Sequence, residues 1–172
     1  MTRLDQNRAV YQIAKKAKVP IDGVKNLVIW GNHSATLVPD FSNILIQDKK
    51  ICNFIEDEEW LKTTFMQLIQ QRGAKIIEKR KKSSAASASQ AIIDTVKSIY
   101  SKNQDLFSLA VCSDSNAYGI EKDLIFSFPC ISLGEGGYKI VENISLEEFI
   151  RNKIKLSEKE LIEEKRQVAH LL

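Results

Sequence analysis

The chain has 172 residues, of which 44% are hydrophobic and 27% charged; this length suits one domain with its own core, and this composition excludes an intrinsically disordered chain. Its 25 basic and 22 acidic residues leave a net charge of only +3, which gives no support to a nucleic-acid or membrane-surface partner. No apolar run approaches the length of a transmembrane helix.

Three cysteines, Cys52, Cys112 and Cys130, lie far apart and form no CxxC pair. An odd number of widely spaced cysteines in apolar or strand-like surroundings is typical of reduced structural thiols, and a zinc site is not expected. The first twenty residues alternate charged and apolar side chains and contain no continuous hydrophobic stretch, which argues against a secretory signal peptide. We therefore expect a cytoplasmic protein without a bound metal.

The first third of the chain predicts one helix followed by short strands. Apolar residues recur at helical spacing over residues 4–18, and Pro20 closes this segment. The β-branched and aromatic run that begins with "VKNLVIW" continues to Pro39 and predicts a strand that passes over His33. The runs "NILIQ" and "KKICNFI" flank a polar turn around Asp48 and predict a hairpin.

The middle of the chain predicts two helical stretches. Residues 56–82 repeat apolar side chains at helical spacing, and Gly73 is expected to mark a bend between two helical pieces. The small-residue run "SSAASASQA" then leads into a second helix. We expect this helix to open at Ser83 or Ser84, because a serine at the N-cap can accept hydrogen bonds from the free backbone N–H groups of the first turn.

The last third predicts strands and then a terminal helix. The strand candidates are "LFSLAVCS", "LIFSFPCISL" and "GYKIVE", and the helix covers residues 145–172. Ser145 with Glu148 and Ser157 with Glu160 have capping-box spacing, so this helix has two candidate starting points and is either continuous or broken near Leu156. Without internal repeats or a linker, these elements predict a single α+β unit.

Asp5, Arg8 and His33 are the candidate chemical residues. Asp5 and Arg8 are three residues apart and share a helix face; such a pair is most often a surface ion pair, and a lone histidine after an apolar run is most often a hydrogen-bonded core residue. Together, however, a carboxylate could fix the tautomer of the imidazole and leave its other nitrogen free for a substrate. An arginine could grip a substrate carboxylate through two parallel N–H bonds. The trio would suit a 2-oxo acid.

Six separated segments cover essentially the whole chain in a recognisable order. They are "TRLDQNRA", "VKNLVIWGNHSATLVPD", "QQRGAKII", "KKSSAASASQAI", "SDSNAYGI" with "DLIFSFP", and "LSEKELIEEK". Together they resemble the cytosolic type of malate dehydrogenase, in the lactate/malate dehydrogenase superfamily. The resemblance implies interconversion of malate and oxaloacetate with NAD, and the α+β fold of the C-terminal domain, in which antiparallel strands pack with long helices.

The resemblance also implies a role for each residue of the trio. His33 would be the proton donor and acceptor for the substrate oxygen, Asp5 its carboxylate partner, and Arg8 the ligand of the substrate carboxylate. Ser84 resembles a hydroxyl-bearing position that lines the substrate and nicotinamide side, and neighbouring serines carry the same group. The chain departs from many relatives at Gln6, where they have a histidine, and at Ala35, where they have serine or threonine.

The family carries a dinucleotide-binding Rossmann domain ahead of the equivalent of Met1. No G-x-G-x-x-G motif follows a strand in this chain, and its glycine cluster at residues 134–137 lies between two predicted strands. We therefore expect residues 1–172 to form the substrate-binding half and NAD to be bound mainly by the missing half. The chain alone should be inactive, and the resemblance implies a homodimer with the first helix at the contact.

Two other functions stay open at this point. A non-catalytic interaction domain could retain the fold, although such a domain would be expected to lose one of the trio, and none is lost. A lactate-type 2-hydroxy acid dehydrogenase half is the second alternative, because the loop that selects the substrate lies in the missing half. The basic run "EKRKK" is short and lacks aromatic neighbours, which favours a solvated helix end over a nucleic-acid site.

Overall fold

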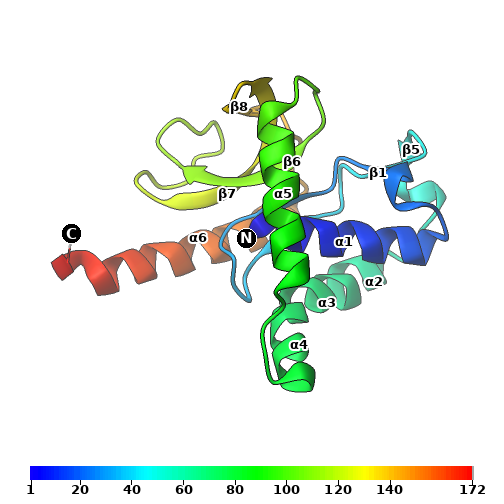
Figure 1. Ribbon diagram of the computed structural model, residues 1–172, viewed down its shortest axis with the longest axis horizontal. Coiled ribbons are helices and arrows are strands. Elements are labelled where there is room, and N and C mark those ends of the chain that lie inside the picture. The colour runs from blue at the N-terminus through cyan, green and yellow to red at the C-terminus, as the bar shows by residue number, and fades with distance from the viewer. Residues whose placement is uncertain (172) are drawn as a thin grey trace.

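The computed structural model describes residues 1–171, in which helices surround three small antiparallel sheets (Figure 1). All strand pairs are antiparallel, and the expected α+β class is confirmed. The helices are α1 (Thr2–Ala17), α2 (Glu58–Trp60), α3 (Met66–Gln70), α4 (Arg72–Arg80), α5 (Ala86–Tyr100) and α6 (Glu148–Val168), with short 3-10 helices η1 (Ile21–Gly23), η2 (Ile51–Asn53) and η4 (Ala169–Leu171) and a π-helical segment η3 (Leu61–Phe65).

The strands form two short sheets in the first third of the chain and one longer sheet near its end. The sheet orders are β1-β4-β5, β2-β3 and β6-β7-β8. Their bounds are β1 (Val24–Lys25), β2 (Val28–Trp30), β3 (Val38–Asp40), β4 (Leu45–Ile46), β5 (Lys49–Lys50), β6 (Phe107–Cys112), β7 (Ile125–Gly134) and β8 (Gly137–Ile140). The three strands expected in the last third are confirmed.

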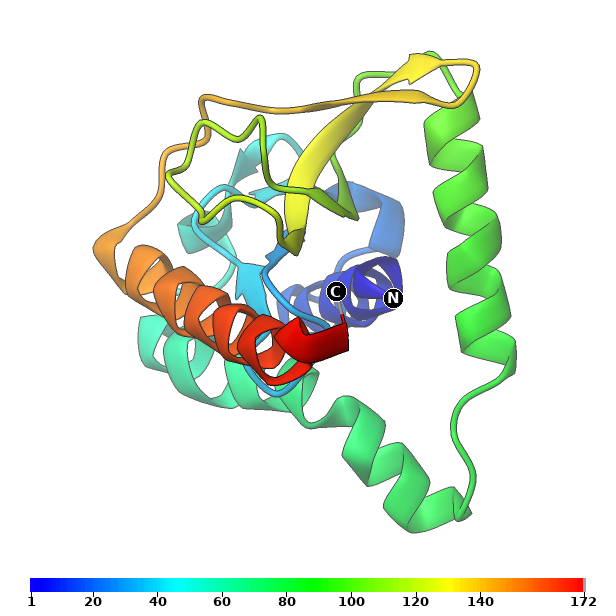
Figure 2. The same ribbon diagram turned by 90° about the vertical axis from the view of Figure 1, so that its left-hand side faces the viewer.

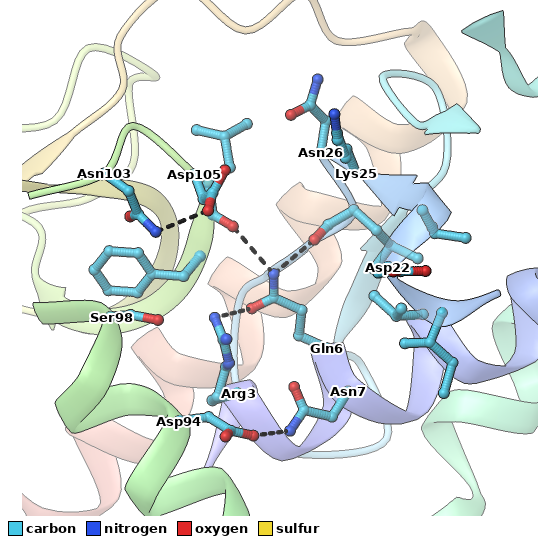
Figure 3. A pocket seen from close by; sticks show the side chains of 16 residues that line it. Arg3, Gln6, Asn7, Asp22, Lys25, Asn26, Asp94, Ser98, Asn103 and Asp105 are labelled. Atoms are coloured by element: carbon cyan, nitrogen blue, oxygen red, sulfur yellow. Dashed lines mark hydrogen bonds between the residues drawn. The ribbon is translucent and has the colours of Figure 1, made fainter. Parts of the chain in front are cut away.

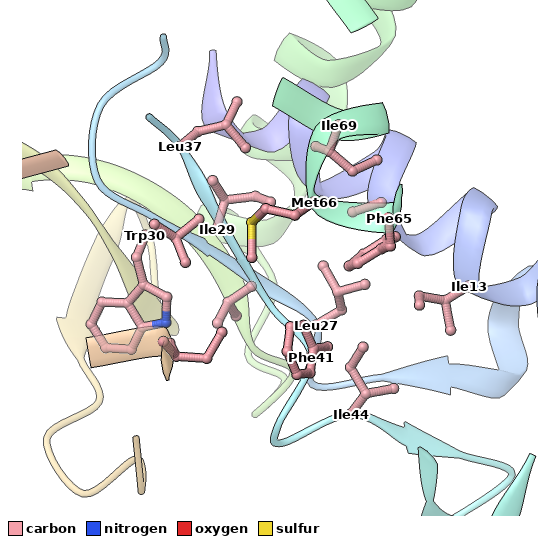
Figure 4. Close-up of a cluster of buried hydrophobic side chains, with 14 of the residues drawn as sticks. Ile13, Leu27, Ile29, Trp30, Leu37, Phe41, Ile44, Phe65, Met66 and Ile69 are labelled. Carbon is pink, nitrogen blue, oxygen red and sulfur yellow. The ribbon is translucent and has the colours of Figure 1, made fainter. Parts of the chain in front are cut away.

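Helix α1 forms as expected because its apolar residues recur on one face, which is buried. Lys18 ends the helix in the left-handed conformation, and its backbone N–H bonds to the carbonyls of Ala14 and Lys15. Ile13 on α1 packs with Leu27, Ile29 and Phe65 in the central apolar cluster (Figure 4). Each such side chain contributes roughly 1.5–3 kcal/mol when fully buried, so α1 is fixed firmly against β2.

The backbone around His33 differs from the strand predicted there. A strand through His33 was expected, but β2 ends at Trp30 and β3 begins at Val38, and the two strands pair antiparallel. Gly31 has a φ of +90°, which side-chain-bearing residues rarely adopt, and it turns the chain out of the strand. Residues 31–37 therefore form a turn that carries His33. The hairpin around Asp48 is found, with strands of two residues each, but the second predicted strand is shorter than expected because Ile51–Asn53 form the 3-10 helix η2.

The helical stretch over residues 58–80 is confirmed, but its bend lies at Gln71 instead of Gly73. Gln71 has a ψ of −1°, outside the regular helix, whereas Gly73 lies inside α4. Helix α5 begins at Ala86, so neither Ser83 nor Ser84 caps it. Ser84 instead accepts a hydrogen bond from Arg8.

The terminal helix α6 is continuous, and neither expected capping box forms. Glu147 is its N-cap, without a side-chain cap bond, and Ser145 lies outside the helix. Ser157 is buried in the middle of α6, where its hydroxyl accepts a hydrogen bond from the backbone N–H of Asn32 in the turn that carries His33. Figure 2 shows α5 at one side of the molecule, away from α6. Within residues 1–171, no helix combines the length and the apolar character that a membrane crossing requires.

Replacement of Gly31 should destabilise the fold. A Cβ at this position would lie 2.2 Å from Ser157 Oγ and would also need a φ of +90°, so we expect Gly31→Ala to lower the free energy of unfolding by about 2 kcal/mol or more. Gly73→Ala is the matched control, because a Cβ there meets no atom within 4 Å and alanine favours a helix by about 1 kcal/mol. Chemical denaturation measures both; equal losses would contradict this account.

The three cysteines should differ in reactivity. Cys52 and Cys112 are exposed, whereas Cys130 is buried, and burial raises the pKa of the Cys130 thiol to about 12. The thiolate is the nucleophile, and at pH 8 only about one Cys130 side chain in ten thousand would be ionised. We expect iodoacetamide to modify Cys52 and Cys112 in the native chain and Cys130 only on unfolding, as measured by peptide mass spectrometry. Equal rates at all three would contradict the buried position.

Candidate active site

Asp5 is the centre of a group of four residues that the fold brings together. Its Oδ2 lies 2.5 Å from His33 Nδ1, and its Oδ1 lies 3.4 Å from Arg8 Nη1. The second guanidinium nitrogen, Arg8 Nη2, donates to Ser84 Oγ at 3.4 Å. Asp5 and Arg8 come from one face of α1, His33 from the turn after β2, and Ser84 from the segment before α5. The four residues singled out from the sequence are therefore neighbours.

The carboxylate of this group is buried, and the imidazole faces outward. The Asp5 side chain is 2% exposed, whereas the His33 side chain is 44% exposed. A carboxylate only accepts hydrogen bonds, so Nδ1 of His33 carries the proton in this pair. Nε2 has no hydrogen-bond partner within residues 1–171. The neutral ring can therefore accept a proton at Nε2 from a molecule beside it, and the protonated ring can return it.

Arg8 lies between this pair and Ser84 and remains a cation. Burial lowers the pKa of Arg8, and the nearby Asp5 carboxylate partly offsets this effect; an arginine nevertheless stays protonated at any physiological pH. Both of its contacts are long, at 3.4 Å. A guanidinium has five N–H donors, so Arg8 keeps donors for an incoming carboxylate.

All four residues line one cavity of about 440 Å³, a size within the range of small-molecule sites. Arg8 is its only arginine or lysine, and Asp5 is its only acidic residue. Much of the remaining wall comes from small and apolar side chains of the turn before β3 and of helices α3, α4 and α5. These include Ala35, Leu37, Ile69, Ala74, Ile77 and Ala88. The cavity can hold a small molecule with one carboxylate at Arg8 and a polar oxygen at His33.

Helix α6 holds the turn that carries His33. This contact was not predicted from the sequence. The backbone N–H of Asn32 donates to Ser157 Oγ at 2.8 Å, and the side chains of Asn32, Ser34 and Thr36 donate to Glu160. Burial acts to raise the pKa of Glu160, but these hydrogen bonds outweigh it and hold the pKa below its usual value. Asn32 had been given no role. The signal in the sequence for this contact was the three-residue spacing of Ser157 and Glu160, which puts both side chains on one face of a helix.

The two departures from the family pattern lie at different places. Gln6 is buried; its side-chain nitrogen donates to the Leu27 carbonyl at 2.9 Å, and its oxygen accepts from the Ser108 backbone N–H at 2.9 Å. Gln6 therefore ties α1 to the segment before β2 and to β6. Ala35 lines the cavity beside His33.

A larger cavity of about 590 Å³ lies against another face of α1 (Figure 3). It shares no lining residue with the cavity at His33. Its one arginine, Arg3, lies in the field of two carboxylates, Asp94 and Asp105, and Asn7 donates to Asp94 at 2.7 Å. Arg3 Nη1 also donates to Gln6 Oε1 at 3.4 Å, while Arg3 Nε is buried without a hydrogen-bond partner among residues 1–171. The lining contains no histidine or cysteine that could carry a proton or act as a nucleophile. We therefore assign the chemistry to the smaller cavity. Among residues 1–171, no three His, Cys, Asp or Glu side chains form a group that could hold a metal ion.

Comparisons with known proteins place the chain in a family. The family model for the lactate/malate dehydrogenase, alpha/beta C-terminal domain matches residues 2–172. The chain is 48% identical over 172 residues to a malate dehydrogenase of Chlamydia felis, covering 99% of this chain and 52% of that protein. It is 47% identical over 173 residues to a chloroplastic NADP malate dehydrogenase of Mesembryanthemum crystallinum, covering 99% and 39%.

Solved structures give the same result. A malate dehydrogenase from Naegleria fowleri superposes with a TM-score of 0.93 at 41% identity, over 100% of this chain and 52% of that one. A lactate dehydrogenase of Trichomonas vaginalis in complex with NADH and oxamate superposes with a TM-score of 0.92 at 30% identity, over 99% and 53%. The chain spans about half the length of most of these relatives. It belongs to the lactate/malate dehydrogenase family, in which it corresponds to the alpha/beta C-terminal domain.

Proposed function

We propose that this chain is the substrate-binding half of an NAD-dependent malate dehydrogenase that interconverts malate and oxaloacetate. The observation that carries the proposal is the arrangement of His33, Asp5 and Arg8 around one cavity. Malate dehydrogenases between 41% and 48% identical to the chain support the choice of substrate. The coenzyme is less constrained, because one relative is named for NADP and the chain covers only 39% of it.

In the proposed reaction the chain handles a proton and a carboxylate. During malate oxidation, Nε2 of His33 would take the proton of the substrate hydroxyl, while the hydride would leave the carbon atom that bears this hydroxyl. The ring becomes an imidazolium, which Asp5 stabilises through its bond to Nδ1. In the reverse direction the imidazolium gives this proton to the carbonyl oxygen of oxaloacetate. Arg8 holds one substrate carboxylate, so the reacting oxygen stays beside His33.

The residues present fit one end of NAD and not the other. Gly73, Ala74 and Ala88 add little bulk to the cavity wall, which suits a flat nicotinamide ring, and Ser84 would offer its hydroxyl to the amide of that ring. Among residues 1–171 there is no glycine-rich turn at the start of a helix to hold the pyrophosphate; Gly134 and Gly136 make the turn between β7 and β8. NAD supplies or accepts the hydride when it is bound. Its main binding surface is therefore assigned to a half outside this chain.

We further propose that the cofactor half and a second copy of the protein cover surfaces that this chain exposes. Only Ala91 of α5 is buried in the described chain, whereas Ile92, Ile93, Val96 and Tyr100 are exposed. A run of apolar side chains on one helix is typical of a contact surface. The homodimer and the cytoplasmic location stay predictions that rest on the family resemblance.

A lactate-type dehydrogenase is the second candidate. The Trichomonas vaginalis structure, described as a lactate dehydrogenase, is 30% identical to the chain over nearly its full length, and the trio fits any 2-oxo acid. Comparing pyruvate with oxaloacetate in the assay described below separates the two. A non-catalytic interaction domain is disfavoured because Asp5, Arg8 and His33 are all present and in contact or close to one another.

The chain alone should not oxidise NADH with oxaloacetate, and it should do so when the cofactor half of a close relative is added as a separate polypeptide. Hydride transfer needs cofactor and substrate held together, and the main binding surface for the cofactor is proposed to lie in the other half. Absorbance of NADH measures the reaction. Activity of the chain alone would show that the cofactor site has been misplaced, and inactivity of the mixture despite formation of a complex would contradict the proposed function.

In the active mixture, His33→Asn and Arg8→Gln should fail differently. Loss of the proton carrier should lower kcat by about a hundredfold or more with little change in KM. Loss of two charge-assisted hydrogen bonds to the substrate should lower kcat/KM by about a hundredfold, mainly by raising KM for oxaloacetate. Arg166→Gln is the control, since Arg166 pairs only with Glu163 on the exposed surface of α6. Equal effects of Arg166→Gln and Arg8→Gln would contradict the assignment of Arg8.

A further inference from the structure

The turn that carries His33 is held by α6 more than by its own backbone. Between Gly31 and Leu37, the one backbone hydrogen bond within the turn runs from Leu37 N–H to the Ser34 carbonyl, at a long 3.4 Å. Gly31 itself is fixed to β7, because its N–H and carbonyl bond to Ser127 at 3.1 and 3.0 Å. The turn beyond Gly31 therefore depends on side-chain contacts for its shape.

Those contacts converge on one carboxylate of α6. Glu160 Oε2 accepts from Asn32 Nδ2 at 3.1 Å, from Thr36 Oγ1 at 2.5 Å and from the Ser34 hydroxyl. Asn32 precedes His33 and Ser34 follows it, so Glu160 grips the chain on both sides of the imidazole. Glu164, one helical turn further along α6, accepts a second bond from Asn32 Nδ2 at 3.0 Å.

Ser157 completes this network, and the count of its protons fits an ionised carboxylate at the centre. Ser157 Oγ lies 2.8 Å from the Asn32 backbone nitrogen, which donates to it, and 2.9 Å from Thr36 Oγ1. A hydroxyl has one proton, so Ser34 and Thr36 each give theirs to Glu160, and Ser157 can give its own to Thr36. Every proton then has an acceptor. All three bonds end on the one oxygen Oε2. An amide could put its carbonyl oxygen at this place, but that oxygen carries no charge, so the three bonds would lose their charge-assisted strength.

We propose that Glu160 is a positioning residue for the proton transfer, acting through the turn to keep the His33 ring against Asp5 without touching the substrate. This inference rests on the proposed function only for its effect on catalysis. Its structural half, that a carboxylate on α6 sets the orientation and hydrogen bonding of the His33 ring, is a property of this chain alone. The two parts can therefore fail separately.

The chain offers a direct readout because it has only two histidines, His33 and His170. Nitrogen-15 NMR of the imidazoles reports the share of the neutral His33 ring that carries its proton on Nδ1, and exchange with water reports how well that proton is held. In Glu160→Gln we expect this proton to exchange about tenfold faster or more, the effect of losing charge-assisted hydrogen bonds. The share of the Nδ1–H form should fall. His170, near the end of α6, should not change.

Glu163→Gln is the matched control because it removes the same charge from the same helix at a side chain that pairs with Arg166 instead of the turn. It should leave His33 unchanged. If Glu160→Gln does not fold, as judged by circular dichroism, the double variant Ser34→Ala/Thr36→Val removes two donors to the carboxylate at half-buried positions of the turn and should loosen the ring in the same way. An unchanged His33 ring in a folded Glu160→Gln or in the double variant overturns the inference, as does an equal response to Glu163→Gln.

The mixture with the cofactor half supplies the catalytic readout. Glu160→Gln should lower kcat for oxaloacetate reduction about tenfold and leave KM nearly unchanged, because Arg8 is not displaced. A merely structural role would reduce the amount of active enzyme without altering the His33 signals of the folded chain. Inactivity of the unmodified mixture would count against the proposed function, while the NMR result would still decide the role of Glu160.

Discussion

A buried carboxylate is costly unless charged or hydrogen-bonding groups surround it, and this requirement at Asp5 organises the site. Asp5 is 1% exposed on the first turns of α1. Its two oxygens face His33 and Arg8, so the turn after β2 and one face of α1 must meet at this point. Removing either partner would leave the other to compensate the charge alone. The same bonds that satisfy Asp5 also fix the imidazole tautomer and place the guanidinium at the cavity.

The sequence predicted those elements whose shape follows from local periodicity. Helix α1, the helical stretch before Lys81 and the strands β6, β7 and β8 all carry apolar residues in a pattern typical of their type, and all are found. The strand expected through His33 was wrong for a physical reason. Apolar residues flank both sides of the turn, so their pattern continues across it, while a single glycine with a φ of +90° reverses the chain.

The candidate site was predictable only in part. Asp5, Arg8 and His33 were candidates because of their chemistry, whereas their roles, and Ser84, came from the family resemblance. No spacing rule brings residues 28 or 76 positions apart into contact. The serines show the limit of local rules. Ser157 with Glu160 was interpreted as a capping box, since the pair has the right spacing, but the same spacing also presents both side chains to a neighbouring segment. Residues more than 120 positions away decide which of these occurs.

The exposure of the site indicates that the two halves of the proposed enzyme contribute differently: this half places the polar groups, and the other half shields them from water. The His33 side chain is 44% exposed, and Arg8 has only long contacts to protein, so water competes for both groups in this half. In water the attraction between a guanidinium and a substrate carboxylate is weak, and it strengthens several-fold when the surrounding dielectric constant falls. A second half that closes over the cavity would supply this change together with the cofactor. The residues of this half are already arranged before the second half closes over the cavity, whereas the electrostatic strength of their contacts with the substrate depends on that closure. Substrate binding and proton transfer in the proposed enzyme would therefore depend on the assembly of the two halves.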